Sequence, residues 1–471
     1  MKIKSALAAA LIAFSLFAFY ACSEKETAND KYVLSVEYYE DGILNVALTV
    51  DGGAKKDGAT EIPFNLYPAA YREGAAITPL KEGDEAGEFL VREVTFNGRS
   101  AKFRFDGKDE NVLSVMTDGA LKKGERFSVG IEYSCVLSKS DERLALTEST
   151  VNLGNFIPML CVYDGDEYIV CEYGKTGDPF VSECADFSVS LVVPSEYAVA
   201  SGIKAKSLDS GENRSEYRYE IKNVRDVAFT LCKDYSIKQQ KWGDKTVNYY
   251  FYSDENSDAT LTVAVDALGY FSEKFGEYPY DTFALAETAF DAGGMEYPCF
   301  AMIADDLGYS DYIFAVVHEI AHQWWYGLVG NDQVKEAYLD ESLAEYSTYA
   351  YFADNPCEYV DAQRFYEETK SGCAIAERAF TSLYDDYLPR IDRRLDEFIN
   401  AYDYYDCVYA KGFLALKAAE DSIGRRKLAS LMKKYCEKNR YGIADTEKFL
   451  SSTGTARPIL ESYLSGKAIV R

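Results

Sequence analysis

The chain has 471 residues, of which 48% are hydrophobic and 27% charged, as is ordinary for a folded globular protein with room for about two or three domains. Its 77 acidic and 50 basic residues give a formal net charge of −27. Phosphate backbones and anionic lipid headgroups would be repelled by this charge, so we expect no nucleic-acid partner and no charge-driven membrane binding.

The N-terminus has the layout of a secretory signal. Lys2 and Lys4 precede an apolar run over residues 6–19, which is shorter than the roughly 20 residues that span a bilayer. The residues around Cys22 resemble a bacterial lipobox. Residues 1–22 are therefore predicted to be a cleaved signal peptide, and residues 23–31 a polar tether.

Two destinations follow from this signal. If Cys22 receives a lipid, the exported protein is anchored to the outer face of a bacterial membrane, and that anchor is its only expected membrane contact. If Cys22 receives none, the protein is secreted.

Strands are predicted between residues 32 and 240. Runs such as YVLSVEYY, ILNVALTV and DFSVSLVVP are short, rich in β-branched and aromatic residues, and separated by turn residues. We expect an all-β sandwich or saddle-like domain built from packed sheets. Asn97-Gly98 marks a hairpin, whose loop we expect to be longer than two residues.

Helices dominate residues 241–471. Apolar spacing predicts a helix over residues 258–275, followed by the strand TFALAETAF and a mainly α domain. Further helices are expected at about 310–326, 335–353, 357–371, 395–421 and 425–438. The eleven cysteines have no CxxC pair, which favours buried free thiols and leaves one or two disulfides open.

Both histidines of the chain lie in the sequence HEIAH. His318 and His322 are four residues apart, so on a helix they project from one face, where they can bind one metal ion. The alternative is two hydrogen-bonded core histidines beside an ion-paired Glu319. The surrounding apolar run indicates a buried helix, where unpaired imidazoles and a carboxylate would be costly.

Glu341 is the candidate for a third ligand. It falls in the first turn of the next predicted helix, where a negative side chain is favoured. Two imidazoles and one carboxylate leave a tetrahedral Zn²⁺ with one open position, as hydrolytic sites require. Glu345 is the rival ligand, and Asp332 or Asp340 are candidate partners for the outer histidine nitrogens.

Glu319 lies between the histidines and faces another side of the helix. From there it can take the proton of a metal-bound water that attacks a carbonyl, and deliver it to the leaving amine. Upstream, the segment DAGGMEYP can be a simple turn. Alternatively, Gly293 and Gly294 admit a substrate backbone and Glu296 binds its ammonium group.

Taken together, GGMEY at 293–297, HEIAHQWW at 318–325 and the LDES around Glu341 resemble the M1 family of zinc aminopeptidases, gluzincins that include aminopeptidase N. The resemblance implies a thermolysin-like catalytic domain over 241–471, with one Zn²⁺ per chain. It also implies zinc ligands His318, His322 and Glu341, the general base Glu319, and Glu296 as the holder of the substrate's amino terminus, with the neighbouring residues Gly293, Gly294, Met295 and Tyr297 in substrate binding.

The resemblance further implies an oxyanion donor before a Lys-Gly pair, which is Tyr409 here. Three positions depart from the family pattern, because Tyr297, Asp340 and Ser342 stand where Asn, Asn and Gly are common. The large C-terminal helical domain of many members is not expected, so the cleft would be more open.

The sequence therefore predicts a zinc aminopeptidase that hydrolyses the first peptide bond of peptides with a free N-terminus. Two alternatives remain. A thermolysin-like endopeptidase would share the zinc chemistry but give Glu296 no role. A catalytically silent surface lipoprotein would bind peptides without cleaving them.

Overall fold

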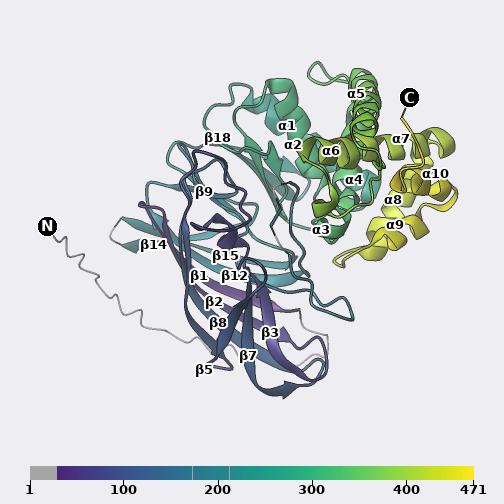
Figure 1. The fold of residues 1–471 in the computed structure, drawn as a ribbon. Helices are drawn as coiled ribbons and strands as arrows, with labels where there is room; N and C mark the ends of the chain where they lie inside the picture. The colour runs from purple at the N-terminus through teal and green to yellow at the C-terminus, as the bar shows by residue number, and fades with distance from the viewer. Residues whose placement is uncertain (1–28, 172, 175, 212, 471) are drawn as a thin grey trace.

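The computed structural model describes residues 29–171, 173–174, 176–211 and 213–470 (Figure 1). The predicted signal peptide, Cys22 and most of the predicted tether lie outside these residues. A helix long and apolar enough to cross a membrane is not found in the described part of the chain.

A β-rich part over residues 31–251 is followed by a helical part over residues 257–464, which confirms the predicted fold class. The largest sheet has eight strands in the order β14-β15-β12-β1-β2-β8-β4-β5. These strands are β1 (Lys31–Tyr39), β2 (Ile43–Gly53), β4 (Glu88–Phe96), β5 (Arg99–Ser100), β8 (Arg126–Val136), β12 (Ala185–Pro194), β14 (Lys206–Gly211) and β15 (Arg214–Val224).

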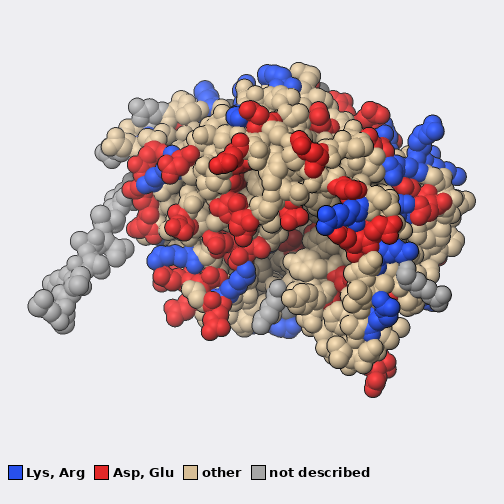
Figure 2. All heavy atoms as spheres, turned by 90° about the horizontal axis from the view of Figure 1, so that it is seen from above, with Lys and Arg blue, Asp and Glu red and all other residues tan. Residues whose placement is uncertain are grey.

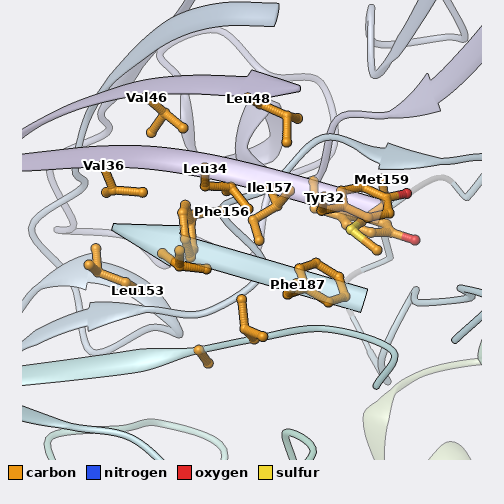
Figure 3. Packing of buried hydrophobic residues seen from close by; sticks show 14 of the residues in the cluster. Tyr32, Leu34, Val36, Val46, Leu48, Leu153, Phe156, Ile157, Met159 and Phe187 are labelled. Atoms are coloured by element: carbon orange, nitrogen blue, oxygen red, sulfur yellow. The ribbon is translucent and has the colours of Figure 1, made fainter. Parts of the chain in front are cut away.

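One face of this sheet forms the core of the β-rich part. In β1 every second residue is buried, including Leu34 and Val36, and β2 and β12 alternate in the same way. Figure 3 shows these side chains packed with Phe156 and Ile157. Two four-stranded sheets complete this part: β11 (Met159–Leu160), β3 (Ala59–Asn65), β7 (Val112–Leu121) and β6 (Phe103–Asp106); and β13 (Ala198–Ala200), β16 (Phe229–Cys232), β10 (Val151–Leu153) and β9 (Leu144–Leu146).

A five-stranded sheet joins the two parts. Its strands are β17 (Ser236–Trp242), β18 (Lys245–Phe251), β19 (Thr282–Thr288), β21 (Phe300–Ala304) and β20 (Gly294–Met295), in that order. In β19, Ala284 faces the core of the β-rich part, and its neighbour Leu285 faces the helices. The boundary predicted between residues 240 and 241 therefore falls inside β17.

The helical part packs on the far face of that sheet (Figure 1). Its α-helices are α1 (Ser257–Phe275), α2 (Tyr309–Ala321), α3 (Gln333–Glu336), α4 (Tyr338–Asp354), α5 (Ala362–Leu383), α6 (Ala401–Tyr405), α7 (Gly412–Ile423), α8 (Arg425–Asn439), α9 (Thr446–Ser452) and α10 (Arg457–Leu464). A π-helix, Asp406–Lys411, connects α6 to α7. The sequence patterns did not indicate α9 and α10.

One local expectation was wrong. The loop of the β4–β5 hairpin has only two residues, because Phe96 pairs with Arg99. Asn97 and Gly98 both have positive φ, 49° and 75°, which is the type I′ geometry of a two-residue hairpin. The ten described cysteines are free thiols, eight of them buried.

Candidate functional site

The HEIAH sequence spans the end of α2. His318 lies in the last turn, and His322 follows the helix with helical torsion angles of −62° and −15°, so both rings face the same side. Their Nε2 atoms are 3.0 Å apart. Glu341 enters from the first turn of α4, with its Oε2 atom 3.2 Å from His318 Nε2 and 3.3 Å from His322 Nε2. Three donor atoms of these buried side chains thus converge on one point.

In both histidine rings the Nδ1 atom, which faces away from Glu341, contacts an oxygen atom of the protein. His322 Nδ1 donates to the carbonyl of Trp325 at 2.8 Å, and His318 Nδ1 lies 3.0 Å from Glu345 Oε2. In the neutral tautomers with the proton on Nδ1, both Nε2 atoms are free to bind one metal ion beside Glu341. Glu345 is therefore a partner of His318 rather than a rival ligand.

Neither aspartate suggested by the sequence fills that role. Asp332 caps α3 by accepting bonds from the backbone of Val334 and Lys335. Asp340 accepts a hydrogen bond from Gln333 instead. The sequence offered no means of choosing between these two aspartates, because it does not show where a buried side chain points.

The donor set fits zinc. Tetrahedral Zn²⁺ with nitrogen and oxygen ligands at about 2.0–2.1 Å places the ligand atoms roughly 3.3 Å from each other. The three separations here are 3.0, 3.2 and 3.3 Å. Although burial opposes it, His322 and His318 hold the pKa of Glu341 below its ordinary value, so this candidate ligand stays ionised.

Glu319 lies beside these three residues and is 6% exposed. One of its oxygens, Oε2, is buried without a hydrogen-bond partner in the described part of the chain. Burial raises the pKa of Glu319 to about 8, which suits a group that accepts a proton. A Cβ atom on Gly294 would lie 2.3 Å from the other oxygen, Oε1, so glycine is needed there.

The GGMEY segment is only partly in the cavity. Gly293, Gly294 and Glu296 line it. Met295 and Tyr297 lie outside the cavity lining and belong to the core of the β-rich part, where Tyr297 Oη donates to Asn155 at 2.8 Å. Tyr297 is thus a packing residue that joins the GGMEY segment to the β-rich part.

Asp178, which no sequence pattern indicated, lies on a loop of the β-rich part. A carboxylate oxygen of Asp178 and one each from Glu296 and Glu341 all lie within 4.8 Å of one another. Arg143 pairs with Asp178 and donates to Met295 Sδ, so the loop is held against the GGMEY segment. A short Gly-Asp-Pro sequence without periodicity carried no signal that could have found it.

Tyr409 lies on the π-helix Asp406–Lys411, a type of distortion that is frequent at functional sites. Its ring lies nearly parallel to that of His318, with centroids 6.0 Å apart. Burial raises the pKa of Tyr409, so the phenol keeps its proton and can donate it. Tyr404 and Tyr405 pack against this ring and share the cavity wall.

One cavity of about 350 Å³ is lined by His318, His322, Glu341, Glu319, Glu296, Asp178 and Tyr409. Its charged residues are five acidic side chains and one arginine, together with the two histidines: Asp178, Glu296, Glu319, Glu341, Glu345, Arg143, His318 and His322. Since Arg143 is paired with Asp178, the cavity favours cations. Acidic side chains are also widespread on the face of the molecule drawn in Figure 2.

Known proteins share this fold. An M1 zinc metallopeptidase from Deinococcus radiodurans superposes with a TM-score of 0.65 at 15% identity, covering 94% of this chain and 96% of that one. A variant of the Deinococcus radiodurans protein has been solved with a Tyr-Ser-Ala substrate, with a TM-score of 0.62. A two-domain M1 zinc metallopeptidase bound to L-arginine superposes with a TM-score of 0.64 at 14% identity, over 94% of this chain and 95% of that chain.

Curated relatives are longer than this chain. Tricorn protease-interacting factor F2 of Thermoplasma acidophilum is 22% identical over 383 residues, which cover 77% of this chain and 45% of the relative. Aminopeptidase M1-B of Oryza sativa subsp. japonica is 27% identical over 286 residues, which cover 56% of this chain and 31% of the relative. The chain therefore spans less than half the length of these relatives.

A family model described as the peptidase family M1 domain matches residues 259–462. The match contains both histidines, Glu319, Glu296, Glu341 and Tyr409. The converging His-His-Glu donors and the shared two-part fold agree with it. Residues 259–462 of this chain therefore form a peptidase family M1 domain.

Proposed function

We propose that this protein is a zinc-dependent aminopeptidase that removes the N-terminal residue of peptides. The observation that carries the proposal is the group of three carboxylates Asp178, Glu296 and Glu341, which we call the amine pole. An ammonium group has three N–H donors, and three carboxylate oxygens within 4.8 Å of one another match them. The pole is next to the metal site, so a bound amino terminus sets the first peptide bond at the reacting position.

His318, His322 and Glu341 hold one Zn²⁺ in this proposal. Zinc supplies a Lewis acid that polarises the peptide carbonyl and makes water a nucleophile at neutral pH. Glu319 takes a proton from the attacking water and delivers it to the leaving amine. Tyr409 donates its phenolic proton in a hydrogen bond to the developing oxyanion.

The test compares fluorogenic aminoacyl substrates with their N-acetylated counterparts on zinc-quantified protein. We expect cleavage of the free-amine compounds only, loss of activity with a chelator, and recovery on adding Zn²⁺. Glu319→Gln should lower kcat by about a thousandfold or more with zinc retained. Tyr409→Phe should lower kcat by about a hundredfold, whereas the neighbouring Tyr405→Phe serves as a matched control with little effect.

Two results would redirect the proposal. Equal cleavage of acetylated peptides, together with a silent Glu296→Ala change, would favour a thermolysin-like endopeptidase. Purified protein that binds peptide but neither zinc nor reporter substrates would favour a surface peptide-binding protein.

Export rests on the sequence alone. We propose a lipid anchor on Cys22 at the outer face of a bacterial membrane. Detergent-phase partitioning of the full chain, lost on Cys22→Ala, tests it, and a wholly soluble secreted product would contradict it.

A further inference from the structure

Gln333 lies at the point where the three chain segments of the amine pole meet. It begins α3 and is 1% exposed. Its side-chain Nε2 donates to Asp340 Oδ2 at 2.6 Å and to Glu296 Oε1 at 3.3 Å. Its backbone N–H donates to the carbonyl of Phe180 at 3.3 Å, on the loop that carries Asp178.

These contacts reach each carboxylate of the amine pole or the chain beside it. Glu296 is contacted directly. Asp340 precedes Glu341 and accepts a 2.9 Å hydrogen bond from the Glu341 backbone N–H. Phe180 follows Asp178 by two residues, and its ring lies under the guanidinium of Arg143, which is the partner of Asp178. Gln333 thus connects a loop of the β-rich part, the GGMEY segment and the N-terminus of α4.

The chemistry of an amide suits this position. Glu296, Asp340 and Glu341 are buried close together, and burial raises the pKa of Glu296 to about 7, with His322 acting in the opposite direction. A neutral donor holds two of these groups in place without cancelling their charge. A lysine here would instead occupy the pole as a permanent counter-ion. The other amide atom, Oε1, has no hydrogen-bond partner among the described residues, so both side-chain bonds come from Nε2.

We propose that Gln333 is the positioning residue of the amine pole: it fixes the spacing of Asp178, Glu296 and Glu341, and so sets how strongly the enzyme recognises a free amino terminus. The inference rests on the proposed function. It makes a prediction that differs from a packing role, because a packing residue would change stability without changing the contribution of the substrate's amine.

The probes are two zinc-binding inhibitors that differ only in the amine, leucine hydroxamate and 4-methylpentanohydroxamate. The ratio of their inhibition constants measures what the amine contributes to binding. Gln333→Met keeps the volume and removes both donors. Gln333→Asn keeps an amide that is too short to reach both carboxylates, and it serves if the first variant does not fold. Asn331→Leu is the matched control, because Asn331 is a buried amide two residues away that donates to the backbone carbonyl of Glu336.

We expect the ratio of the two inhibition constants, which measures the contribution of the amine, to fall about tenfold in Gln333→Met and Gln333→Asn. The inhibition constant of the amine-free compound, zinc content and kcat should stay within about threefold of the parent, while KM for aminoacyl substrates rises. An unchanged ratio in both variants, or the same change in Asn331→Leu, would overturn the inference. A parent enzyme that shows no preference for the amine would overturn the proposed function itself, and the inference with it.

Discussion

The hydroxyl of Ser342 donates a 2.6 Å hydrogen bond to the carbonyl oxygen of Val408. Ser342 follows the metal-ligand candidate Glu341 in α4, and Val408 precedes Tyr409 in the π-helix. A π-helix interrupts the regular i→i+4 hydrogen-bond pattern of the neighbouring α-helical turns, and here a side-chain hydroxyl donates to one of its carbonyl groups. This bond therefore connects the helix of Glu341 directly to the segment that presents the proposed oxyanion donor. The serine stands where the family commonly has glycine.

Removing this bond should affect the chemical step more than substrate binding. Ser342→Ala leaves the Val408 carbonyl without this donor, which costs about 1 kcal/mol and loosens the π-helix around Tyr409. We expect kcat to fall about three- to tenfold with KM and zinc content unchanged. Thr348→Val is the control, since Thr348 makes a similar bond to Ala344 within the same buried helix. A rise in KM with kcat unchanged would contradict the assignment.

Gly412 should be intolerant of alanine because of the same serine. A Cβ atom at Gly412 would lie 1.9 Å from Ser342 Oγ and 2.6 Å from Ser342 Cβ. Although alanine is the better helix former, the overlap should make Gly412→Ala less stable by about 1–3 kcal/mol. Ser342→Gly removes both contacting atoms, so the double variant should recover most of the loss in a thermal melt. Additive effects of the two changes would show that the contact is not the cause.

The sequence predicts those parts of the site that depend on local spacing. His318 and His322 share a face because a helix repeats every 3.6 residues, and Glu341 opens the next helix. The other parts of the site are brought together by packing between distant segments of the chain, and no sequence periodicity reports such contacts. They are Asp178, Gln333 and the histidine partners Trp325 and Glu345. The same limit explains why the prediction that Asp332 or Asp340 binds a histidine was wrong.

The fold likewise contains elements that the sequence pattern predicts and elements that it does not. Alternating strands such as β1 and the long helix α1 were predicted well, because one buried face imposes a period of two or 3.6 residues. The short helices α9 and α10 span at most eight residues and carry about two turns of pattern, too little to distinguish them from loops. Asn97-Gly98 was recognised as a turn, but the length of its loop depends on the register of β4 and β5.

Gly294 offers a direct test of the role of Glu319. Alanine there would place its Cβ atom 2.3 Å from Glu319 Oε1, so the carboxylate must move. We expect Gly294→Ala to lower kcat by about a hundredfold or more while the His-His-Glu site keeps its zinc. Gly372→Ala is the control, because Gly372 has open space around it in α5. Full activity in Gly294→Ala would show that the position of Glu319 is not critical for catalysis.

Asp226 makes the stability of the protein depend on pH. It is buried in the β-rich part, is 3% exposed, and accepts hydrogen bonds from Val227 N and from Asn155 Nδ2. Burial raises its pKa from 3.8 to about 7, with those two bonds acting in the opposite direction. Between pH 4 and pH 7 the folded chain therefore holds a proton that the unfolded chain has released. Stability must fall as the pH rises through this range.

Asp226→Asn removes this titration, since asparagine is neutral in both states. Each unit of pKa shift corresponds to about 1.4 kcal/mol. Relative to the parent, the unfolding free energy of the variant should therefore increase by up to roughly 4 kcal/mol between pH 4 and pH 8. Denaturant unfolding at both pH values measures it. Asp244→Asn removes the same charge at an exposed turn, and it corrects for the general effect of a net charge of −27. If both variants show the same pH dependence, Asp226 does not hold a proton in the folded chain, and the pH effect belongs to the overall charge.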